Sequence, residues 1–271
     1  TIPLAHLTAD LPASLQRDCL LTHFFNPPRY MRLLEMVAGP TTRLEAIDAI
    51  GDFADRRLGK GVVRAKDTPG FVANRIGTYW LQTALDLAIE FDLGVEAADA
   101  VLGPPVGIPK TGVFGLLDLV GIDLIPKVAG SLQRLLPATD RLRANRRPQP
   151  LIERMLAQGL TGRKGKGGFY RLREAGAGRV KEAIDLRTGD YRASFKARPD
   201  SVAAARAGGL QALLSHPDRS GRYAWTVLSE TLAYAAELVP EISDSIDAVD
   251  EAMRLGYNWT WGPFELIDRI G

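Results

Sequence analysis

Short apolar runs and one amphipathic segment organise the first 68 residues of this chain. The runs have the length of buried strands, and we expect strands at 20–24, 33–37 and 62–65. Between the second and third runs, apolar residues recur at helical spacing, so Thr41 or Thr42 should cap a helix that Gly59 ends. A strand, a helix and a strand in this order predict a parallel α/β layer, too small for a complete doubly wound domain.

From Gly70 onward the pattern becomes helical. Apolar residues between Phe71 and Phe91 follow helical spacing and predict a helix of about 20 residues. Helical patterns return at 224–238 and 246–255. Residues 174–200 are polar instead, and Leu186–Tyr191 has the composition of a turn between two short extended pieces.

A ten-residue pattern, G-x-F-x-L-x-D-x-x-G, occurs twice in the chain. The two copies are Gly112–Gly121 and Gly262–Gly271. A long amphipathic helix precedes each copy, so we expect two related helical units that pack on one another, with Phe114 and Phe264 both buried. Asp118 and Asp268 could act in catalysis, but we expect them to hydrogen-bond within their repeats, because both copies keep them.

The charge is nearly balanced, with 34 basic and 32 acidic residues. No strong field for nucleic acid or a membrane surface is therefore expected. Four arginines gather beside prolines, at Arg141, Arg143, Arg146 and Arg147. We expect them to lie in a solvated loop, with phosphate binding as the alternative.

The single cysteine, Cys19, allows no internal disulfide and fits a reducing compartment, so we expect a cytoplasmic protein. No apolar run reaches the ~18 residues that a membrane span needs. The chain begins without methionine and has no signal-peptide pattern, which leads us to expect a piece of a longer protein.

His23 and Glu35 are the strongest candidates for chemistry. His23 comes off an apolar run just before the turn residues Asn26-Pro27-Pro28, and Glu35 is a lone carboxylate inside the next apolar run. Two strands joined by a tight loop can bring these side chains together, as a general base and its orienting group require. A buried structural pair is the alternative. The other histidines, His6 and His216, lack such a setting and should lie on the surface.

These features resemble the 3-hydroxyacyl-CoA dehydrogenase family over essentially the whole chain. The two strands with the His/Glu pair are followed by Lys66–Arg75 (KDTPGFVANR) and Thr161–Tyr170 (TGRKGKGGFY) in the family's order. The second repeat, with Tyr257-Asn258-Trp259 before it, resembles long bacterial members that carry two helical units and a fused enoyl-CoA hydratase domain.

The resemblance implies a fold of α/β followed by mostly α, with a partial Rossmann sheet and two related helical units. We expect the domains to be 1–68, the C-terminal half of a Rossmann-type NAD-binding domain; 69–175, the first helical unit; and 176–271, a linker and the second helical unit. It implies NAD-dependent oxidation of (S)-3-hydroxyacyl-CoA to 3-oxoacyl-CoA in fatty-acid β-oxidation. The expected partners are these acyl-CoA compounds, a second copy of the chain through the helical units, and a thiolase.

The resemblance also assigns site residues. His23 would accept the hydroxyl proton, Glu35 would hold the imidazolium, and Asn74 would help to orient the substrate oxygen. Asn26 would lie near the nicotinamide, and Lys164 would reach the cofactor; no metal site is expected. The residue types leave structural alternatives open: a helix cap for Asn74, a turn role for Asn26 and a solvated lysine for Lys164.

Two features of the family are missing from the sequence. The phosphate-cradling G-x-G-x-x-G motif occurs nowhere in the chain, and the family's catalytic serine would fall at or just before Thr1. We therefore expect a fragment that is inactive alone. The residue that would select between NAD and NADP is expected in the missing half of the domain. The rival interpretations are a non-catalytic helical assembly module and a related β-hydroxyacid dehydrogenase, although the latter is expected to use a lysine base.

Overall fold

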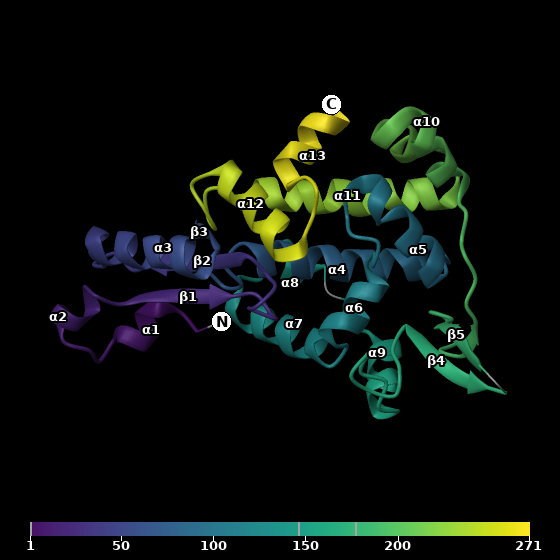
Figure 1. Ribbon diagram of the computed structural model, residues 1–271, viewed down its shortest axis with the longest axis horizontal. Helices are drawn as coiled ribbons and strands as arrows, with labels where there is room; N and C mark the ends of the chain where they lie inside the picture. The colour runs from purple at the N-terminus through teal and green to yellow at the C-terminus, as the bar shows by residue number, and fades with distance from the viewer. Residues whose placement is uncertain (1, 146, 177) are drawn as a thin grey trace. The chain divides into compact units, whose positions relative to one another are not determined.

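The computed structural model describes residues 2–145, 147–176 and 178–271 (Figure 1). By their contacts the residues divide into two compact units, one of Thr1–Gly77 with Leu232–Arg269 and one of Thr78–Thr231. Helices α4 (Ala73–Glu90) and α11 (Arg219–Glu237) each contribute to both units. None of the described helices is long and apolar enough to cross a membrane.

The first unit contains a three-stranded sheet, β1-β2-β3, with helices around it. Besides parts of α4 and α11, its elements are α1 (Leu4–Thr8), α2 (Ala13–Gln16), β1 (Leu20–Phe24), β2 (Leu33–Ala38), α3 (Leu44–Leu58), β3 (Gly61–Ala65), α12 (Ile246–Tyr257) and α13 (Pro263–Ile270). Strands β2 and β3 are parallel, with α3 as their connection, which confirms the predicted α/β layer. Strand β1 runs antiparallel to β2.

Burial differs sharply between the two strands that were both predicted to be buried. Every residue of β2 from Leu33 to Val37 is buried, because helices cover both of its faces. Met36 points toward α3, where it lies against Gly51, and Leu33 points to the other face, against Gly256 of α12. The prediction is wrong for β1, whose residues are half-buried or exposed, since β1 lies at the edge of the described sheet.

The start of α3 also differs from the prediction. Arg43 occupies the N-cap position and makes no side-chain capping bond. The Thr42 hydroxyl instead accepts from the Gly39 N–H and donates to the Cys19 carbonyl, so it fixes the loop rather than the helix. The end is as predicted, because Gly59 adopts φ +65° and closes the helix.

The second unit is mostly helical and carries a separate antiparallel sheet, β4-β5-β6. Its elements are α5 (Val95–Val101), a 3₁₀ turn (Pro104–Val106), α6 (Phe114–Val120), α7 (Leu124–Leu135), α8 (Arg141–Ala144), α9 (Pro150–Ala157), β4 (Tyr170–Ala175), β5 (Gly178–Ile184), β6 (Tyr191–Ala193) and α10 (Asp200–Leu214). The predicted turn joins β5 to β6, where the Asp185 carboxylate accepts from the Arg187 and Thr188 N–H groups.

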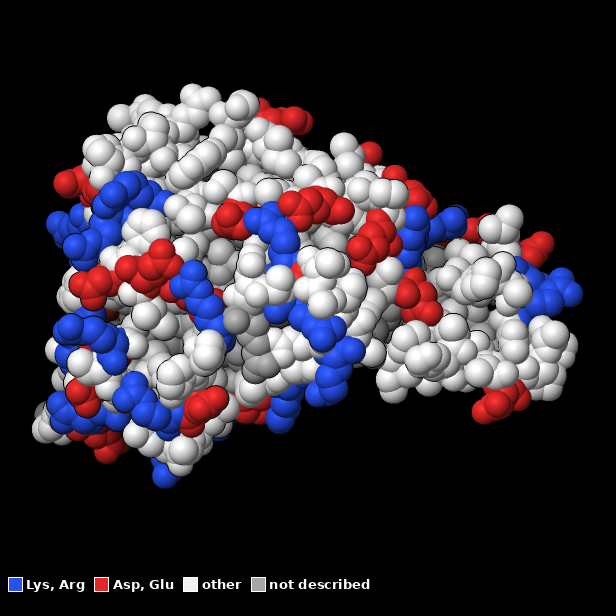
Figure 2. Space-filling view, turned by 180° about the vertical axis from the view of Figure 1, so that it is seen from behind, with Lys and Arg blue, Asp and Glu red and all other residues white. Residues whose placement is uncertain are grey.

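The arginine cluster is not a plain solvated loop, since the short helix α8 begins at Arg141. The described arginines have protein partners: Arg141 pairs with Glu230, Arg147 pairs with Glu90, and Arg143 donates to the Leu136 carbonyl. Arg146 lies outside the described residues. On the face drawn in Figure 2, Lys and Arg side chains are interspersed with Asp and Glu.

Both copies of the ten-residue pattern begin helices, α6 and α13, and each helix start is held by an aspartate from the preceding helix. The Asp99 carboxylate accepts from the N–H groups of Phe114 and Gly115 at 2.8 and 3.2 Å. The Asp250 carboxylate does the same for Phe264 and Glu265 at 2.7 and 3.0 Å. These two aspartates occupy corresponding places before the two copies.

The roles predicted for residues within the pattern hold for only one copy. Phe114 is fully buried, but Phe264 is only half-buried, so that prediction is wrong for the second copy. Asp118 is buried and accepts from the Phe169 and Tyr170 N–H groups at 2.7 and 2.8 Å. Asp268 is exposed and has no such bonds among the described residues, because no segment equivalent to 169–170 covers α13.

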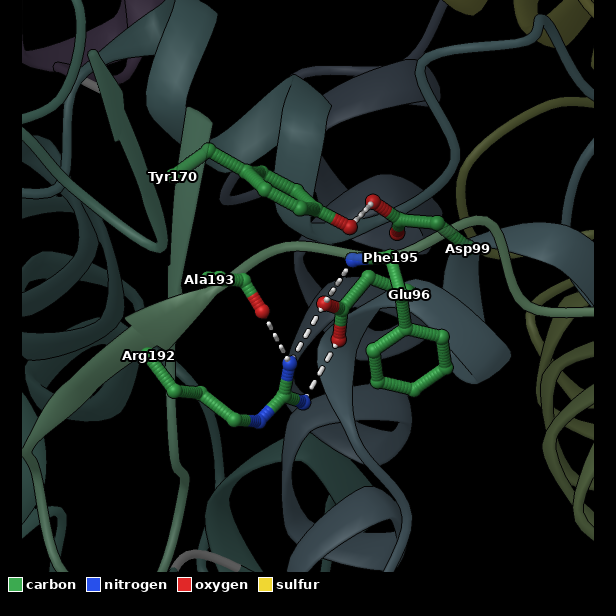
Figure 3. Close-up of polar contacts among 6 residues, drawn as sticks. All are labelled: Glu96, Asp99, Tyr170, Arg192, Ala193 and Phe195. Carbon is green, nitrogen blue, oxygen red and sulfur yellow. Dashed lines mark hydrogen bonds and ion pairs between the residues drawn. The ribbon is translucent and has the colours of Figure 1, made fainter. Parts of the chain in front are cut away.

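The Asp99 carboxylate also accepts a hydrogen bond from a side chain (Figure 3). The Tyr170 hydroxyl donates to its Oδ2 at 2.9 Å, while the nearby Glu96 binds Arg192 at 2.7 and 2.8 Å. Burial raises the pKa of Asp99 to about 7, against the lowering effect of the hydrogen bonds it accepts. The folded protein therefore holds the Asp99 proton more tightly than the unfolded chain does.

We expect Asp99→Asn to change how stability depends on pH. A raised carboxyl pKa contributes stability that is fully present below about pH 4 and is lost as pH rises to about 7. The substitution should remove this loss and make the slope of unfolding free energy against pH less negative, by up to about 1.4 kcal/mol per pH unit. Urea unfolding between pH 4 and 7 measures this slope, and coincident slopes would refute the prediction.

Asp123→Asn provides the control for this experiment. Its hydrogen bond with Lys164 holds the pKa of the Asp123 carboxyl below its usual value, so the titration of this group is confined to the acid edge of that interval. The slope between pH 4 and 7 should then match that of the unaltered protein.

Candidate active site

The sheet register brings His23 and Glu35 together. His23 on β1 is paired directly with Glu35 on β2, so both side chains leave the same face of the sheet. The His23 Nδ1 and Glu35 Oε2 atoms lie 2.7 Å apart, which confirms the predicted proximity. The Glu35 side chain is fully buried, whereas that of His23 is 33% exposed. The imidazole is thus bound to a buried carboxylate on one side and is accessible to solvent on the other.

The second carboxylate oxygen of Glu35 holds the start of α4. Its Oε1 accepts from the backbone N–H groups of Val72 and Ala73 at 3.0 and 2.8 Å. An ionised carboxylate only accepts hydrogen bonds, so this contact requires an N–H at His23 Nδ1, and in a neutral imidazole Nε2 is then the accepting nitrogen. This tautomer is the one that can take a proton from a substrate at Nε2.

A strained turn delivers these two N–H groups. Gly70 and Phe71 both have positive φ, at +83° and +50°. For a bulky residue such as Phe71 this conformation costs on the order of 1–3 kcal/mol and persists only when the surroundings enforce it. The turn places the Phe71 ring 5.5 Å from the His23 imidazole and aims the next two N–H groups at Glu35.

Asn74 lies in the first turn of α4, directly after the residues that bind Glu35. Its side chain is half-buried and makes no hydrogen bond to the other described residues. The capping alternative does not describe it, since the Glu35 carboxylate caps this helix. Its amide therefore remains available to a ligand, and the predicted contact with substrate stays a prediction.

The two residues predicted to contact the cofactor lie in different units. Asn26 is exposed on the loop after β1. That loop is fixed by the Pro27 carbonyl, which accepts from the Tyr30 and Met31 N–H groups, and not by the Asn26 side chain. Lys164 belongs to the second unit, where its Nζ lies 2.7 Å from Asp123 Oδ1. Their cofactor roles stay predictions.

Sequence reasoning missed the side chains that brace the site. Arg75 is fully buried in α4, and it donates to the Tyr234 hydroxyl at 2.6 Å, the Pro69 carbonyl at 3.1 Å and Glu241 at 3.2 Å. These bonds hold the strained turn against the end of α11. An arginine within an otherwise apolar helical stripe was the available signal, because a buried guanidinium requires several partners.

Lys60 and Tyr257 were also missed. Lys60, only 7% exposed, donates from Nζ to the Met31 carbonyl at 2.7 Å and to the Pro28 carbonyl, which ties down the loop after β1. Burial, and secondarily the charge of Glu35, raises the pKa of Tyr257 above its usual value. Nothing in the sequence around Lys60 or Tyr257 indicates that these side chains are buried close to the site.

We expect Glu35→Ala to lower the free energy of unfolding by about 2–5 kcal/mol, because it leaves two buried N–H groups and an imidazole without their acceptor. Glu35→Gln keeps an amide oxygen for the N–H groups of α4 and should cost only about 1 kcal/mol. Urea denaturation measures both losses. Equal losses for the two variants would show that the capping bonds do not support the helix.

Two family models match the chain. The model of the 3-hydroxyacyl-CoA dehydrogenase NAD binding domain matches residues 1–68. That of the 3-hydroxyacyl-CoA dehydrogenase C-terminal domain matches residues 70–172 and 221–271. The expected cofactor, NAD, is thereby confirmed at the level of the family.

Known proteins agree with these matches. A putative fatty acid oxidation complex trifunctional enzyme of Rickettsia felis is 38% identical over 98% of this chain and 36% of its own length. A probable 3-hydroxyacyl-CoA dehydrogenase of Bacillus subtilis is 39% identical over 92% of this chain and 32% of its own length. The chain thus spans about a third of the length of these relatives.

A solved structure shows the same fold. The 3-hydroxybutyryl-CoA dehydrogenase of Escherichia coli K12 superposes with a TM-score of 0.71, covering 100% of this chain and 67% of that one at 21% identity. A Rossmann-like α/β region followed by helical structure is therefore confirmed. By its two family matches and its relatives, this chain belongs to the 3-hydroxyacyl-CoA dehydrogenase family.

Proposed function

We propose that this chain carries the catalytic base of an NAD-dependent dehydrogenase that oxidises (S)-3-hydroxyacyl-CoA to 3-oxoacyl-CoA in fatty-acid β-oxidation. The observation that carries the proposal is the 2.7 Å bond between His23 Nδ1 and Glu35 Oε2, with Nε2 left as the accepting nitrogen. The names of the relatives from Rickettsia felis and Bacillus subtilis support the same reaction class.

The chemistry divides between the cofactor and the chain. Oxidation of a secondary alcohol removes a hydride from carbon and a proton from oxygen, and NAD when bound supplies the hydride acceptor. His23 Nε2 takes the hydroxyl proton, and the Glu35 carboxylate stabilises the imidazolium that forms. The Asn74 amide donates to the same substrate oxygen. A positioned base of this kind contributes about 10²–10⁴ in rate.

The residues present fit the reacting end of NAD better than its pyrophosphate. The exposed Asn26 amide offers both a donor and an acceptor to a nicotinamide carboxamide, and Lys164 is proposed as a second contact. The β2–α3 connection contains no G-x-G-x-x-G, and its Thr42 hydroxyl is engaged with the loop's own backbone. The pyrophosphate would thus be held by sequence other than residues 1–271.

The chain is proposed to be part of a longer protein, with residues 1–68 forming the C-terminal half of a Rossmann domain. Its support is the missing glycine motif and the length of the relatives, about three times that of the match. A fused enoyl-CoA hydratase domain and a thiolase partner belong to the same proposal, supported by the name trifunctional enzyme of one relative. A reducing, cytoplasmic compartment is supported only by the single cysteine.

Two related helical units, 69–175 and 176–271, are proposed to have arisen by duplication. The support is the shared ten-residue pattern and the aspartates Asp99 and Asp250, each of which clasps the start of the helix that contains that pattern. A homodimer through these units is part of the proposal. Exposed apolar side chains on a helix of each of these units, Ile89 on α4 and Trp225 on α11, support it.

We expect Glu35→Gln in the full-length enzyme to lower kcat by about 10²–10⁴, with KM for the acyl-CoA changed less, because the lost charge acts on the imidazolium of the transition state. His23→Gln should cost at least as much, and the double variant little more, since the two groups act as a unit. Steady-state kinetics with 3-hydroxybutyryl-CoA and NAD measures this. Losses that multiply in the double variant would contradict the assignment.

We expect residues 1–271 alone to bind NAD at least about tenfold more weakly than the full-length protein, because a glycine-rich helix start supplies much of a dinucleotide site's affinity. Isothermal titration calorimetry of both proteins tests this. Equal affinities would mean that the pyrophosphate site lies within this chain.

A further inference from the structure

The last turn of α12 fits closely against the strands and helix that build the site. At Gly256, a Cβ atom would lie 2.7 Å from Leu33 Cδ2 and 3.1 Å from Phe25 Cε1. At Gly77 in α4, a Cβ atom would lie 2.0 Å from the Tyr257 hydroxyl oxygen. A methyl group at position 77 would overlap the Tyr257 side chain, and one at position 256 would displace Leu33, so glycine at both places lets α12 bring Tyr257 close to the site.

A row of rings connects Tyr257 with the imidazole. The Tyr257 and Phe25 rings meet edge to face, with centroids 5.9 Å apart and planes at 73°. Phe25 meets the His23 ring in the same manner, at 5.4 Å and 72°. Edge-to-face contacts of this kind contribute about 0.5–1.5 kcal/mol each beyond burial, and they fix relative orientation.

The imidazole needs such a support on the Phe25 side. Glu35 holds one nitrogen and Phe71 holds one flank, but Phe25 lies at the start of an exposed loop, beside the exposed Asn26. A base that is displaced by about 1 Å can lose on the order of 10² in rate. What holds Phe25 in place therefore matters to what His23 can do.

We propose that Tyr257 is a positioning residue for His23, whose ring holds Phe25 against the imidazole and so keeps Nε2 directed toward the substrate. This inference rests on the proposed function and extends it, because it assigns to helix α12, in the proposed second helical unit, a part in the active site. The role is assigned to the ring, because the contact that Tyr257 makes with Phe25 is between the edge of one ring and the face of the other.

The test compares Tyr257→Ala and Tyr257→Phe in the full-length enzyme, with 3-hydroxybutyryl-CoA and NAD as substrates. Tyr257→Ala should lower kcat about 10- to 100-fold with KM within about threefold, and the primary isotope effect of a 3-deuterated substrate should rise as chemistry becomes slower. Tyr257→Phe keeps the ring and should restore kcat to within about twofold.

Met253→Ala is the matched control, because Met253 is fully buried on the same helix and belongs to none of the ring contacts described. It should lower stability without raising the isotope effect. Unchanged kcat in Tyr257→Ala, a loss in Tyr257→Phe as large as that in Tyr257→Ala, or an equal kcat loss in Met253→Ala would each overturn the proposal.

A measurement independent of turnover separates this inference from the proposed function. Diethyl pyrocarbonate modifies accessible unprotonated imidazoles, and peptide mass spectrometry reports His23 apart from His6 and His216. Modification of His23 should be several-fold faster in Tyr257→Ala than in the unaltered protein, with His6 and His216 unchanged. An inactive unaltered enzyme with this difference would refute only the reaction, whereas equal His23 rates would refute the positioning role.

Discussion

The structure of the site depends on one buried carboxylate. Glu35 accepts hydrogen bonds from His23 and from two consecutive N–H groups at the start of α4. A charge in this position would be costly without such donors, and the N–H groups at a helix start are well suited to bind an anion. One side chain thereby orients the His23 imidazole and fixes the position of the helix that carries Asn74. The His23 imidazole and the start of α4 are therefore held in place by the same carboxylate.

Carboxylates that bind two consecutive backbone N–H groups occur elsewhere in the molecule, but there they have no imidazole partner among the described residues. Asp99, Asp118 and Asp250 each accept from two consecutive N–H groups of a later segment of the chain. Burial raises the pKa of all three. None of them holds an imidazole among the described residues. Backbone capping by a buried carboxylate is therefore a structural device in this protein, and at Glu35 the same carboxylate also binds the His23 imidazole.

The sequence predicted those features that depend on local pattern. Strand β2, the helix after Gly70 and the approach of His23 to Glu35 follow from periodicity and from the register of neighbouring strands. It could not predict that β1 lies at an edge, since a short apolar run looks the same in either place. The capping role of Thr42 failed for a similar reason, because its hydroxyl is engaged by Gly39 and by the distant Cys19.

Long-range contacts account for the remaining differences. Arg75 and Tyr257 obtain their roles from segments more than 150 residues away along the chain, which no window of sequence can show. The unequal fates of Asp118 and Asp268 have the same cause, since only the first has a segment packed over it. Identical motifs thus acquire different roles when their surroundings differ.

The close packing of Tyr257 against Gly77 has a consequence for how this protein can change over evolutionary time. Any side chain at position 77 would overlap the Tyr257 ring, so it can be accepted only after that ring has become smaller. Although the two positions are 180 residues apart, their substitutions must occur in a fixed order. A smaller residue must replace Tyr257 before position 77 can accept a side chain. Lineages that lost helix α12 would be free of this constraint and could accept a side chain at position 77.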